Sequence, residues 1–382
     1  MSSAPVIDEA LVRSVVAEVV KAFGRNSALA TGTGPAVVAP SRRPGVFQDA
    51  ASACAAAAIA QKQLAEKGVA ARAKVVEIVK TLATQNAVEW GKFEFAETKI
   101  GRLDHKIEKL QIVKLVPGVE WLHPDARSGD NGITLEEYTP FGVIAAILPM
   151  THSIPTLSGN IINIVAAGNS VVFNPHPGGA RSAALAVAAY NEAIKAAIGI
   201  ENLVCTIEQP TLESFAALCK APEVRVICVT GGPAVVAAAM KSGKRAICAG
   251  PGNPPVLVDG TGDLDKAARD IIQGAAYDNN LLCVGEKEVF VLDSVADRFL
   301  AALGRNGGHQ LNGQQLDKLT AVAFSTKAGA GGCSHPVLNR ALVGVDPSVL
   351  AQHAGATIAA GTQLLFAETD ANHAFVIEEQ MM

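Results

Sequence analysis

The sequence predicts a doubly wound α/β protein, in which helices cover both faces of a parallel β-sheet. Between residues 141 and 258, short apolar runs rich in β-branched residues alternate with alanine-rich stretches of helical periodicity. Hydrophobic residues make up 49% of the chain and aromatic residues only 4%, which suits small side chains packed between helices and a sheet. With 382 residues the chain is long enough for two domains.

Residues 1–23 are predicted to form an amphipathic helix, followed by a flexible linker over 24–45. Apolar side chains recur every fourth residue in the helix, at Ile7, Leu11, Val15 and Val19. The linker has the Gly, Ser, Thr and Pro content of a tether. A short helix cannot bury its apolar face alone, so this one docks either on its own protein or on another.

Residues 46–118 are predicted to be mainly helical, and we interpret them as scaffold, because their charged and apolar positions alternate with helical spacing. Residues 119–141 contain Gly and Asn turn signals followed by an extended run. That pattern predicts a hairpin projecting between the domains.

The strands of the first domain, expected over 46–118 and 142–258, are the runs GVIAAILP, NSVVFNP, NLVCTIE, VRVICVTGG and PVLVDG. Ligands of doubly wound sheets bind at the carboxyl ends of the strands. The residues that follow each strand therefore matter most: 149–155, 174–178 and 230–233. The second α/β domain is expected over 259–382, where a helix, the polar break DNN and the run LLCVGEKEVFVLD occur in order.

Several functional classes are excluded by charge and spacing. Lys and Arg number 32 against 36 Asp and Glu, without a long basic run, so we expect no nucleic-acid partner. Seven cysteines form no C-x-x-C pair and eight histidines lack ligand spacing, so we expect neither a metal site nor disulfides. No apolar run of membrane-spanning length occurs, and charged residues occupy the region of a secretory leader. We expect a cytoplasmic protein without membrane contact.

Both common phosphate loops, G-x-x-x-x-G-K-[ST] and G-x-G-x-x-G, are absent from the sequence. A candidate replacement is the turn Thr230-Gly231-Gly232-Pro233 between a strand and a helix. Glycines allow a ligand to approach the backbone, and the helix start offers N–H groups and a positive dipole end to a pyrophosphate. An ordinary strand–helix turn is the alternative.

Cys283 is the candidate nucleophile, because it follows a polar break and precedes a strand. Cys54, Cys205 and Cys228 fall inside helical or strand patterns, where cysteine is usually a small buried hydrophobe. His152 follows a strand and would serve as an oxyanion donor or proton shuttle, or else have a structural role. The same alternatives apply to His176.

From about Val46 onward the chain resembles the aldehyde dehydrogenase superfamily, and more narrowly its coenzyme A-acylating branch. The motifs AAGNSVVFNPHPGG, VTGGPAVV, AGPGNPPVLVD and NNLLCVGEKE match in sequence and order. The relatives implied are propionaldehyde and acetaldehyde dehydrogenases of bacterial microcompartments, many of which carry a helical encapsulation peptide on a linker. The resemblance thus favours a targeting role for residues 1–23.

The resemblance implies that Cys283 is the nucleophile and that His152 stands where the family has an oxyanion asparagine. It implies NAD contacts at the turn 230–233 and at Glu379, which matches a glutamate that touches the nicotinamide ribose. The full implied set is Thr151, Asn174, Pro175, His176, Thr230, Gly231, Gly232, Pro233, Gly250 and Glu379. The segment ICAGPGNPP lacks the carboxylate that activates water in hydrolytic relatives.

The implied function is oxidation of propionaldehyde or acetaldehyde to acyl-CoA, with NAD and coenzyme A, through a thioester on Cys283. The implied assembly is a homo-oligomer formed through the hairpin 119–141, held inside a microcompartment by contacts of residues 1–23 with shell or cargo proteins. Relative to the family, residues 259–382 are expected to be a C-terminally incomplete catalytic domain. A catalytically weak cargo or assembly protein and a hydrolytic aldehyde dehydrogenase are the alternatives, and the missing carboxylate disfavours the latter.

Overall fold

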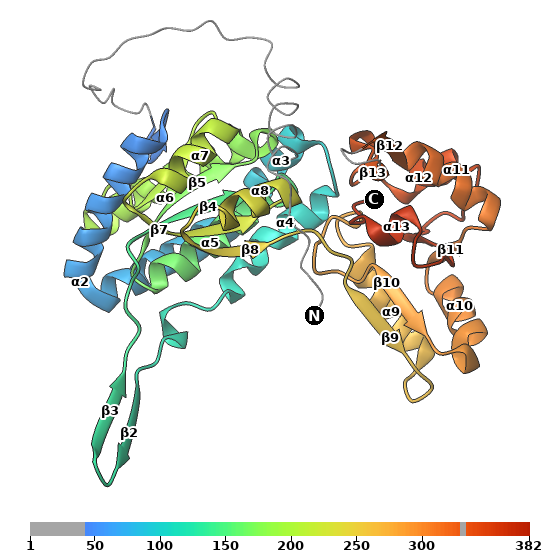
Figure 1. Ribbon diagram of the computed structural model, residues 1–382, viewed down its shortest axis with the longest axis horizontal. Coiled ribbons are helices and arrows are strands. Elements are labelled where there is room, and N and C mark those ends of the chain that lie inside the picture. The colour runs from blue at the N-terminus through green and yellow to red at the C-terminus, as the bar shows by residue number, and fades with distance from the viewer. Residues whose placement is uncertain (1–42, 329–333) are drawn as a thin grey trace, which may run out of the picture.

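The computed structural model describes residues 43–328 and 334–382. The helix expected over 1–23 and most of the linker expected over 24–45 lie outside the described residues. Figure 1 shows two units side by side, a larger one built on a parallel sheet and a smaller one formed by the later part of the chain.

The larger unit contains six parallel strands in the order β1-β6-β5-β4-β7-β8. From β4 the chain moves to one side through β5 and β6, and β7 and β8 then add on the other side. The doubly wound fold is therefore confirmed, and the order reverses between β4 and β7. The strands are β1 (Val46–Phe47), β4 (Val143–Leu148), β5 (Ser170–Pro175), β6 (Val204–Ile207), β7 (Val224–Thr230) and β8 (Arg245–Ala249).

Helices cover both faces of this sheet, because alternate side chains of each strand point in opposite directions. In β4, Ile144, Ala146 and Leu148 pack in a cluster with α5 and α6, and the intervening residues pack with α7, α8 and the first part of α2. The helices are α2 (Ala50–Gln85), α5 (Ser153–Ala166), α6 (Ala180–Ile198), α7 (Leu212–Lys220) and α8 (Pro233–Met240).

Three strands differ from the sequence expectation. The run PVLVDG, expected in the sheet of the first domain, forms β9 (Pro255–Val258), which pairs with β10 (Glu288–Val291) outside the six-stranded sheet. Val46 and Phe47 form β1 at the edge of the sheet, where a helical region was expected. Strand β8 was not recognised, because its burial alternates between exposed and half-buried and it begins with Arg245. Edge strands have only one neighbour and need little apolar content, so periodicity alone identifies them poorly.

Helices α3 (Ala87–Thr98) and α4 (Leu103–Gln111) lie between the sheet and the smaller unit (Figure 1). They follow α2, which is interrupted at Gly68, where φ is +70°. Only a residue without a Cβ adopts such a conformation readily, so this glycine lets the chain change direction within α2.

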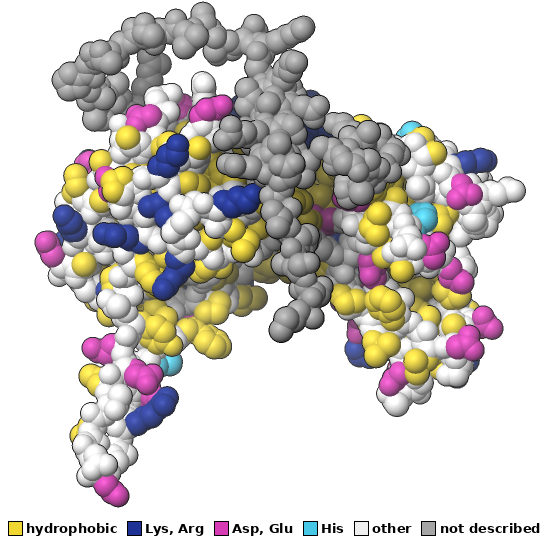
Figure 2. All heavy atoms as spheres, in the orientation of Figure 1, with side chains coloured by type: hydrophobic (Ala, Val, Ile, Leu, Met, Phe, Trp, Pro, Cys, Tyr) yellow, Lys and Arg dark blue, Asp and Glu magenta, His cyan; other side chains and the backbone are white. Residues whose placement is uncertain are grey.

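The antiparallel hairpin of β2 (Asp125–Gly129) and β3 (Gly132–Glu136) projects from the larger unit (Figures 1 and 2). Every residue of both strands is exposed. The exposed side chains include Ile133, which is 78% exposed, and Leu135, which is 62% exposed. Two strands alone are marginally stable in water, so an exposed hairpin that carries large hydrophobic side chains is typical of an interface.

The smaller unit combines the parallel pairs β9–β10 and β11–β14 with the antiparallel pair β12–β13. Its elements are β9 (Pro255–Val258), α9 (Leu264–Ala275), β10 (Glu288–Val291), α10 (Ala296–Arg305), β11 (Gly308–Gln310), α11 (Gly313–Ala323), β12 (Phe324–Ala328), β13 (Ser334–Leu338), α12 (Pro347–Ala354), β14 (Leu364–Phe366) and α13 (Ala374–Ile377). Short 3-10 helices occur at Ile112–Leu115, Val119–Trp121, Pro177–Gly179, Asp293–Val295 and Arg340–Leu342. Within the described residues, no helix combines the length and apolar content that crossing a membrane requires.

Candidate active site

The turn Thr230–Pro233 joins β7 to α8 beside the point where the strand order reverses. Gly232 is the N-cap of α8 and Pro233 is its first residue, and no side chain caps this helix. Gly232 and Pro233 are exposed, while the N–H of Gly231 donates to the Ala249 carbonyl at 3.2 Å. The helix start therefore presents its positive end to the surface, as an anion-binding turn requires.

The helices that follow β4, β5 and β6 begin differently, because protein groups accept their first N–H donors. Glu94 accepts from Ile154 N at 2.8 Å in α5. Glu97 accepts from the N–H groups of Arg181 and Ser182 at the start of α6. Helix α7 begins with a capping box. Among the helices that follow strands of the six-stranded sheet in the described part of the chain, α8 is thus the one left without such an acceptor.

Other residues of the expected nucleotide set also lie at this edge of the sheet, but some have partners within the protein. Asn174, at the end of β5, is buried and accepts from Ser214 Oγ at 2.6 Å. His176 Nδ1 accepts from Gly178 N at 3.0 Å, and burial, with Arg340 nearby, lowers the pKa of His176. The remaining positions are Pro175 at the end of β5, Gly250 directly after β8, and Thr151, which is buried after β4.

Cys283 lies in the connection between α9 and β10 and is exposed to solvent. Cys54 and Cys205 are fully buried. Burial raises the pKa of the Cys54 thiol to about 12 and also raises that of Cys205. Exposure and a flanking loop are what a nucleophilic cysteine needs, and the buried thiols lack both.

Lys287 is a charged neighbour of Cys283. Its Nζ donates to the Asn280 carbonyl at 2.9 Å and to the Gln380 carbonyl. Burial lowers the pKa of Lys287 to about 8, while Glu379 and Cys283 favour its charged form. Burial raises the pKa of the Glu379 carboxyl, which Lys287 and the Gly252 N–H oppose. The structure thus brings Cys283, Lys287 and Glu379 within electrostatic range of one another.

The backbone before Cys283 makes a left-handed turn. Asp278, Asn279 and Asn280 have φ values of 52°, 55° and 61°. This conformation costs about 1–2 kcal/mol per residue for side chains with a Cβ, least for Asp and Asn. The polar break seen in the sequence is therefore the turn itself, and contacts from outside must hold it in place.

His152 is buried at the N-cap position of α5. Its Nδ1 lies 2.7 Å from Lys109 Nζ, and its Nε2 lies 3.1 Å from the Leu281 carbonyl oxygen. Because a carbonyl only accepts, Nε2 carries the proton and Nδ1 accepts from the ammonium. Burial, reinforced by Lys109 and Lys106, holds the pKa of His152 well below its usual range. The N–H that an oxyanion would need is already donated to Leu281, so the donor role stays a prediction.

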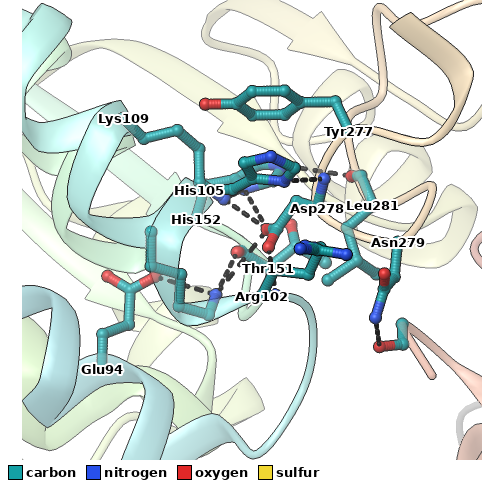
Figure 3. A network of polar contacts seen from close by, with 12 residues as sticks. Glu94, Arg102, His105, Lys109, Thr151, His152, Tyr277, Asp278, Asn279 and Leu281 are labelled. Carbon is teal, nitrogen blue, oxygen red and sulfur yellow. Dashed lines mark hydrogen bonds and ion pairs between the residues drawn. The ribbon is translucent and has the colours of Figure 1, made fainter. Parts of the chain in front are cut away.

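A buried charged network surrounds this imidazole (Figure 3). Lys106 Nζ lies 3.4 Å from Glu94 Oε1 and 3.1 Å from the Thr151 carbonyl oxygen, and Lys109 Nζ lies 2.5 Å from Asp278 Oδ2. Burial raises the pKa of Glu94 and lowers that of Lys109. Two carboxylates and two ammonium groups balance, so the neutral histidine completes a cluster without net charge.

The interpretation of residues 46–118 as scaffold missed this cluster, because Glu94, Lys106 and Lys109 all come from that region. The available signal was the row of Arg102, His105, Lys106 and Lys109, which share one helix face. A solvated polar face has the same pattern, so spacing alone does not separate the two. Within the described ranges, no group of His, Cys, Asp and Glu side chains is arranged to hold a metal ion.

This chain matches a family model, a curated relative and solved structures of aldehyde dehydrogenases. Residues 44–326 match the aldehyde dehydrogenase family. The chain is 40% identical to the acetylating acetaldehyde dehydrogenase EutE of Salmonella typhimurium, over 88% of this chain and 72% of the relative.

Two solved structures are similar over most of the chain. One is the propionaldehyde dehydrogenase of Rhodopseudomonas palustris, with a TM-score of 0.81 and 39% identity, covering 88% of this chain and 74% of that one. That enzyme was solved with propionyl-CoA and, separately, with coenzyme A and an acylated cysteine. The other is a propionaldehyde dehydrogenase from a fucose utilisation microcompartment of Clostridium phytofermentans, with a TM-score of 0.82 and 38% identity, covering 89% and 76%.

Proposed function

The chain belongs to the aldehyde dehydrogenase family, and on that premise we propose that it oxidises a short-chain aldehyde with NAD and transfers the acyl group to coenzyme A. The observation that carries this proposal is the exposed Cys283 beside Lys287, on a turn held between the two units. The acylated cysteine of the similar Rhodopseudomonas palustris enzyme supports the same chemistry. Propionaldehyde and acetaldehyde are the substrates that the similar enzymes indicate.

The thiolate of Cys283 attacks the aldehyde carbonyl and forms the carbon–sulfur bond. The Lys287 ammonium favours the anionic sulfur before attack. The backbone N–H of Cys283 stabilises the oxyanion, with His152 contributing only if its bond to the Leu281 carbonyl opens. When bound, NAD supplies the hydride acceptor that turns the adduct into a thioester. The coenzyme A thiol then displaces Cys283, and one proton is released overall.

Residues 230–233 fit the pyrophosphate of NAD, because α8 begins uncapped and exposed. A β-carbon placed on Gly232 would meet nothing within 4 Å, so the space in front of the helix is open. Exposed N–H groups and a positive dipole end together form an anion site. Glu379 would contact the nicotinamide ribose, as the family resemblance implies.

Acyl transfer is favoured over hydrolysis because no Asp or Glu occurs in residues 247–255. Asn253 of this segment donates to the carbonyls of Val376 and Glu378 at 3.0 and 2.9 Å, and accepts from Gln380 N at 2.9 Å. The segment therefore holds the stretch that carries Glu379 and has no carboxylate to activate water.

For assembly, we propose that residues 1–23 direct the enzyme into a bacterial microcompartment in the cytoplasm, through contacts with shell or cargo proteins. We also propose that the hairpin 119–141 joins copies into a homo-oligomer, which its exposed apolar side chains support. Fusing residues 1–23 to a soluble reporter tests the first proposal, since the reporter should enter shells. Deleting 125–136 should release monomers if the second is right.

The decisive experiment measures NADH formation from propionaldehyde and acetaldehyde, each with and without coenzyme A. We expect coenzyme A-dependent NADH formation, and Cys283→Ala should abolish it while NADH binding persists, because only the covalent step needs the sulfur. Equal rates without coenzyme A, with free acid as product, would identify a hydrolytic enzyme instead. Absence of turnover together with reporter encapsulation would favour the cargo or assembly protein.

A further inference from the structure

Helix α4 forms a platform for the start of the turn that carries Cys283. The Tyr277 ring stacks on His105 with centroids 4.2 Å apart and planes 8° from parallel. The Tyr277 hydroxyl donates to Glu108 Oε2 at 2.9 Å, and the N–H of Asp278 donates to His105 Nδ1 at 2.8 Å. One helix of the larger unit therefore recognises both the ring and the backbone of a segment that belongs to the smaller unit.

The Asp278 carboxylate completes this contact between the units. It is fully buried, and its Oδ1 accepts from the Arg102 N–H at 2.7 Å. Its Oδ2 lies 2.5 Å from Lys109 Nζ and 3.9 Å from Lys106 Nζ. A β-carbon on Gly101 would stand 2.3 Å from Oδ1, so the backbone of the larger unit approaches the carboxylate closely. Charge and shape thus both fix the position of Asp278.

The other end of the left-handed turn is held as well. Asn279 Nδ2 donates to the Gly344 carbonyl at 3.1 Å, and Lys287 Nζ donates to the Asn280 carbonyl at 2.9 Å. The next carbonyl, that of Leu281, accepts from His152 Nε2 at 3.1 Å. Because Lys109 contacts both Asp278 and His152 (Figure 3), one ammonium group connects the two ends of the segment 278–281.

We propose that Asp278 is a positioning residue for Cys283: by binding Lys109 and the Arg102 N–H, its carboxylate fixes the left-handed turn that presents the sulfur. Asp278 contacts no reacting atom and acts through the backbone of residues 278–282. The inference rests on the proposed function for its catalytic readout. Misplacement of a nucleophile by about 1 Å costs on the order of 100-fold in rate, so the effect of losing the carboxylate is measurable.

The test uses the full chain and variants that separate charge from backbone conformation. Asp278→Asn keeps an acceptor for Arg102 and tolerates positive φ, but it leaves Lys109 without its anion. Asp278→Asn combined with Lys109→Met removes one charge of each sign, so the remaining pair of Glu94 and Lys106 stays balanced. Asp278→Gly adopts positive φ freely but has no carboxylate.

We expect the double variant to match the unaltered chain in melting temperature and NADH affinity, with kcat lower by about 10- to 100-fold. The rate at which iodoacetamide alkylates Cys283 should change in the same preparation of the double variant. Asp278→Gly should turn over as slowly as Asp278→Ala, which lacks both the carboxylate and the ready access to positive φ. Asp265→Asn, which removes an exposed carboxylate of α9 from its pair with Arg305, is the matched control and should keep full activity.

Two outcomes would overturn the inference. The first is a folded double variant with unaltered kcat and unaltered alkylation of Cys283. The second is recovery of activity by Asp278→Gly, which would mean that only the backbone conformation at this position matters. If the unaltered chain makes no NADH with either aldehyde, the proposed function fails, whereas the alkylation rates of the same variants still decide whether Asp278 positions Cys283.

Discussion

The junction between β4 and α5 and the junction between β7 and α8 occupy equivalent places on either side of the point where the strand order reverses. Both connect a buried parallel strand to a helix whose N-terminus points toward the same edge. At α5, Glu94 accepts a first-turn N–H, and His152 and Thr151 lie buried against Lys109 and Lys106. At α8 the turn 230–233 has no side-chain cap, and Gly232 and Pro233 are exposed.

The difference shows that the sheet topology places two positive helix N-termini at the same edge. Neighbouring side chains decide whether each N-terminus binds a protein carboxylate or stays open to a ligand. A positive helix end attracts whichever anion is available. Glu94 from α3 occupies that place at α5, so this junction positions protein groups. No carboxylate of the described residues does so at α8, so that junction stays available for a ligand.

Removing the protein anion at α5 should have the largest effect. Glu94→Ala deprives the buried Lys106 of its nearest carboxylate and leaves the Ile154 N–H without an acceptor, which should lower the free energy of unfolding by about 3–5 kcal/mol. Urea denaturation measures this change in the free energy of unfolding. Glu97→Ala, on the same helix, removes the acceptor at the half-buried start of α6 and should cost only about 1 kcal/mol. An equal loss of unfolding free energy in Glu94→Ala and Glu97→Ala would contradict the idea that the α5 junction depends on a buried ion pair.

Placing an anion at the start of α8 should make the β7–α8 junction resemble the β4–α5 junction, where Glu94 already accepts a first-turn N–H. Gly232→Asp introduces a favoured N-cap residue at a position with φ of −68° and open space around it. We expect stability to be kept while the Kd for NADH rises by at least about 10-fold, or about 1.4 kcal/mol, because the carboxylate takes the place of the pyrophosphate. Gly232→Ser, which caps without charge, is the control for fluorescence titration. Unchanged NADH affinity in Gly232→Asp would place the pyrophosphate elsewhere.

The neutral His152 at the β4–α5 junction should make the free energy of unfolding sensitive to acid. Burial, followed by the charges of Lys109 and Lys106, makes the folded imidazole resist protonation although Asp278 Oδ2 lies 4.0 Å from Nδ1. The unfolded imidazole takes a proton below about pH 6.5. The unfolded state then binds more protons, so the free energy of unfolding falls by up to about 1.4 kcal/mol per pH unit below that value.

His152→Asn should remove this slope, which denaturation at pH 5 and pH 7 measures. The same variant, together with His152→Ala, tests the catalytic role. If the imidazole donates to the oxyanion, His152→Ala lowers kcat by about 10- to 1000-fold and His152→Asn recovers part of it. Equal damage from both variants would favour a proton shuttle, and a pH slope retained in His152→Asn would show that other groups cause it.

The smallest effect concerns Lys287. Its pKa of about 8 means that the cation beside Cys283 is present below that pH and lost above it. Lys287→Met should therefore alkylate about 3-fold more slowly than the unaltered chain at pH 7, the size expected for partly solvated charges. The two rates should converge above about pH 9. A constant ratio of rates across this pH range would show that the loss is structural rather than electrostatic.

The doubly wound sheet and the cysteine loop could be predicted from the amino-acid sequence alone. The strand β4 is apolar at every position and buried at every position, so its composition leaves few alternatives. The turn at 230–233 and the polar break before Cys283 were likewise visible, because Gly, Pro, Asp and Asn mark local backbone conformations that do not depend on distant neighbours.

The contacts that hold the turn before Cys283 depend on tertiary packing. Asp278 meets Lys109, which is 169 residues away in the chain, and Glu94 meets an N–H group 60 residues away. Helix periodicity shows which residues share a face, but charged side chains have the same spacing on a solvated face and in a buried ion network. The packing of α4 against the turn buries these groups, and burial keeps His152 neutral. Glu94, Lys106, Lys109 and Asp278 are residue types that usually lie at the surface, but here they form a buried ion network beside the turn that leads to Cys283.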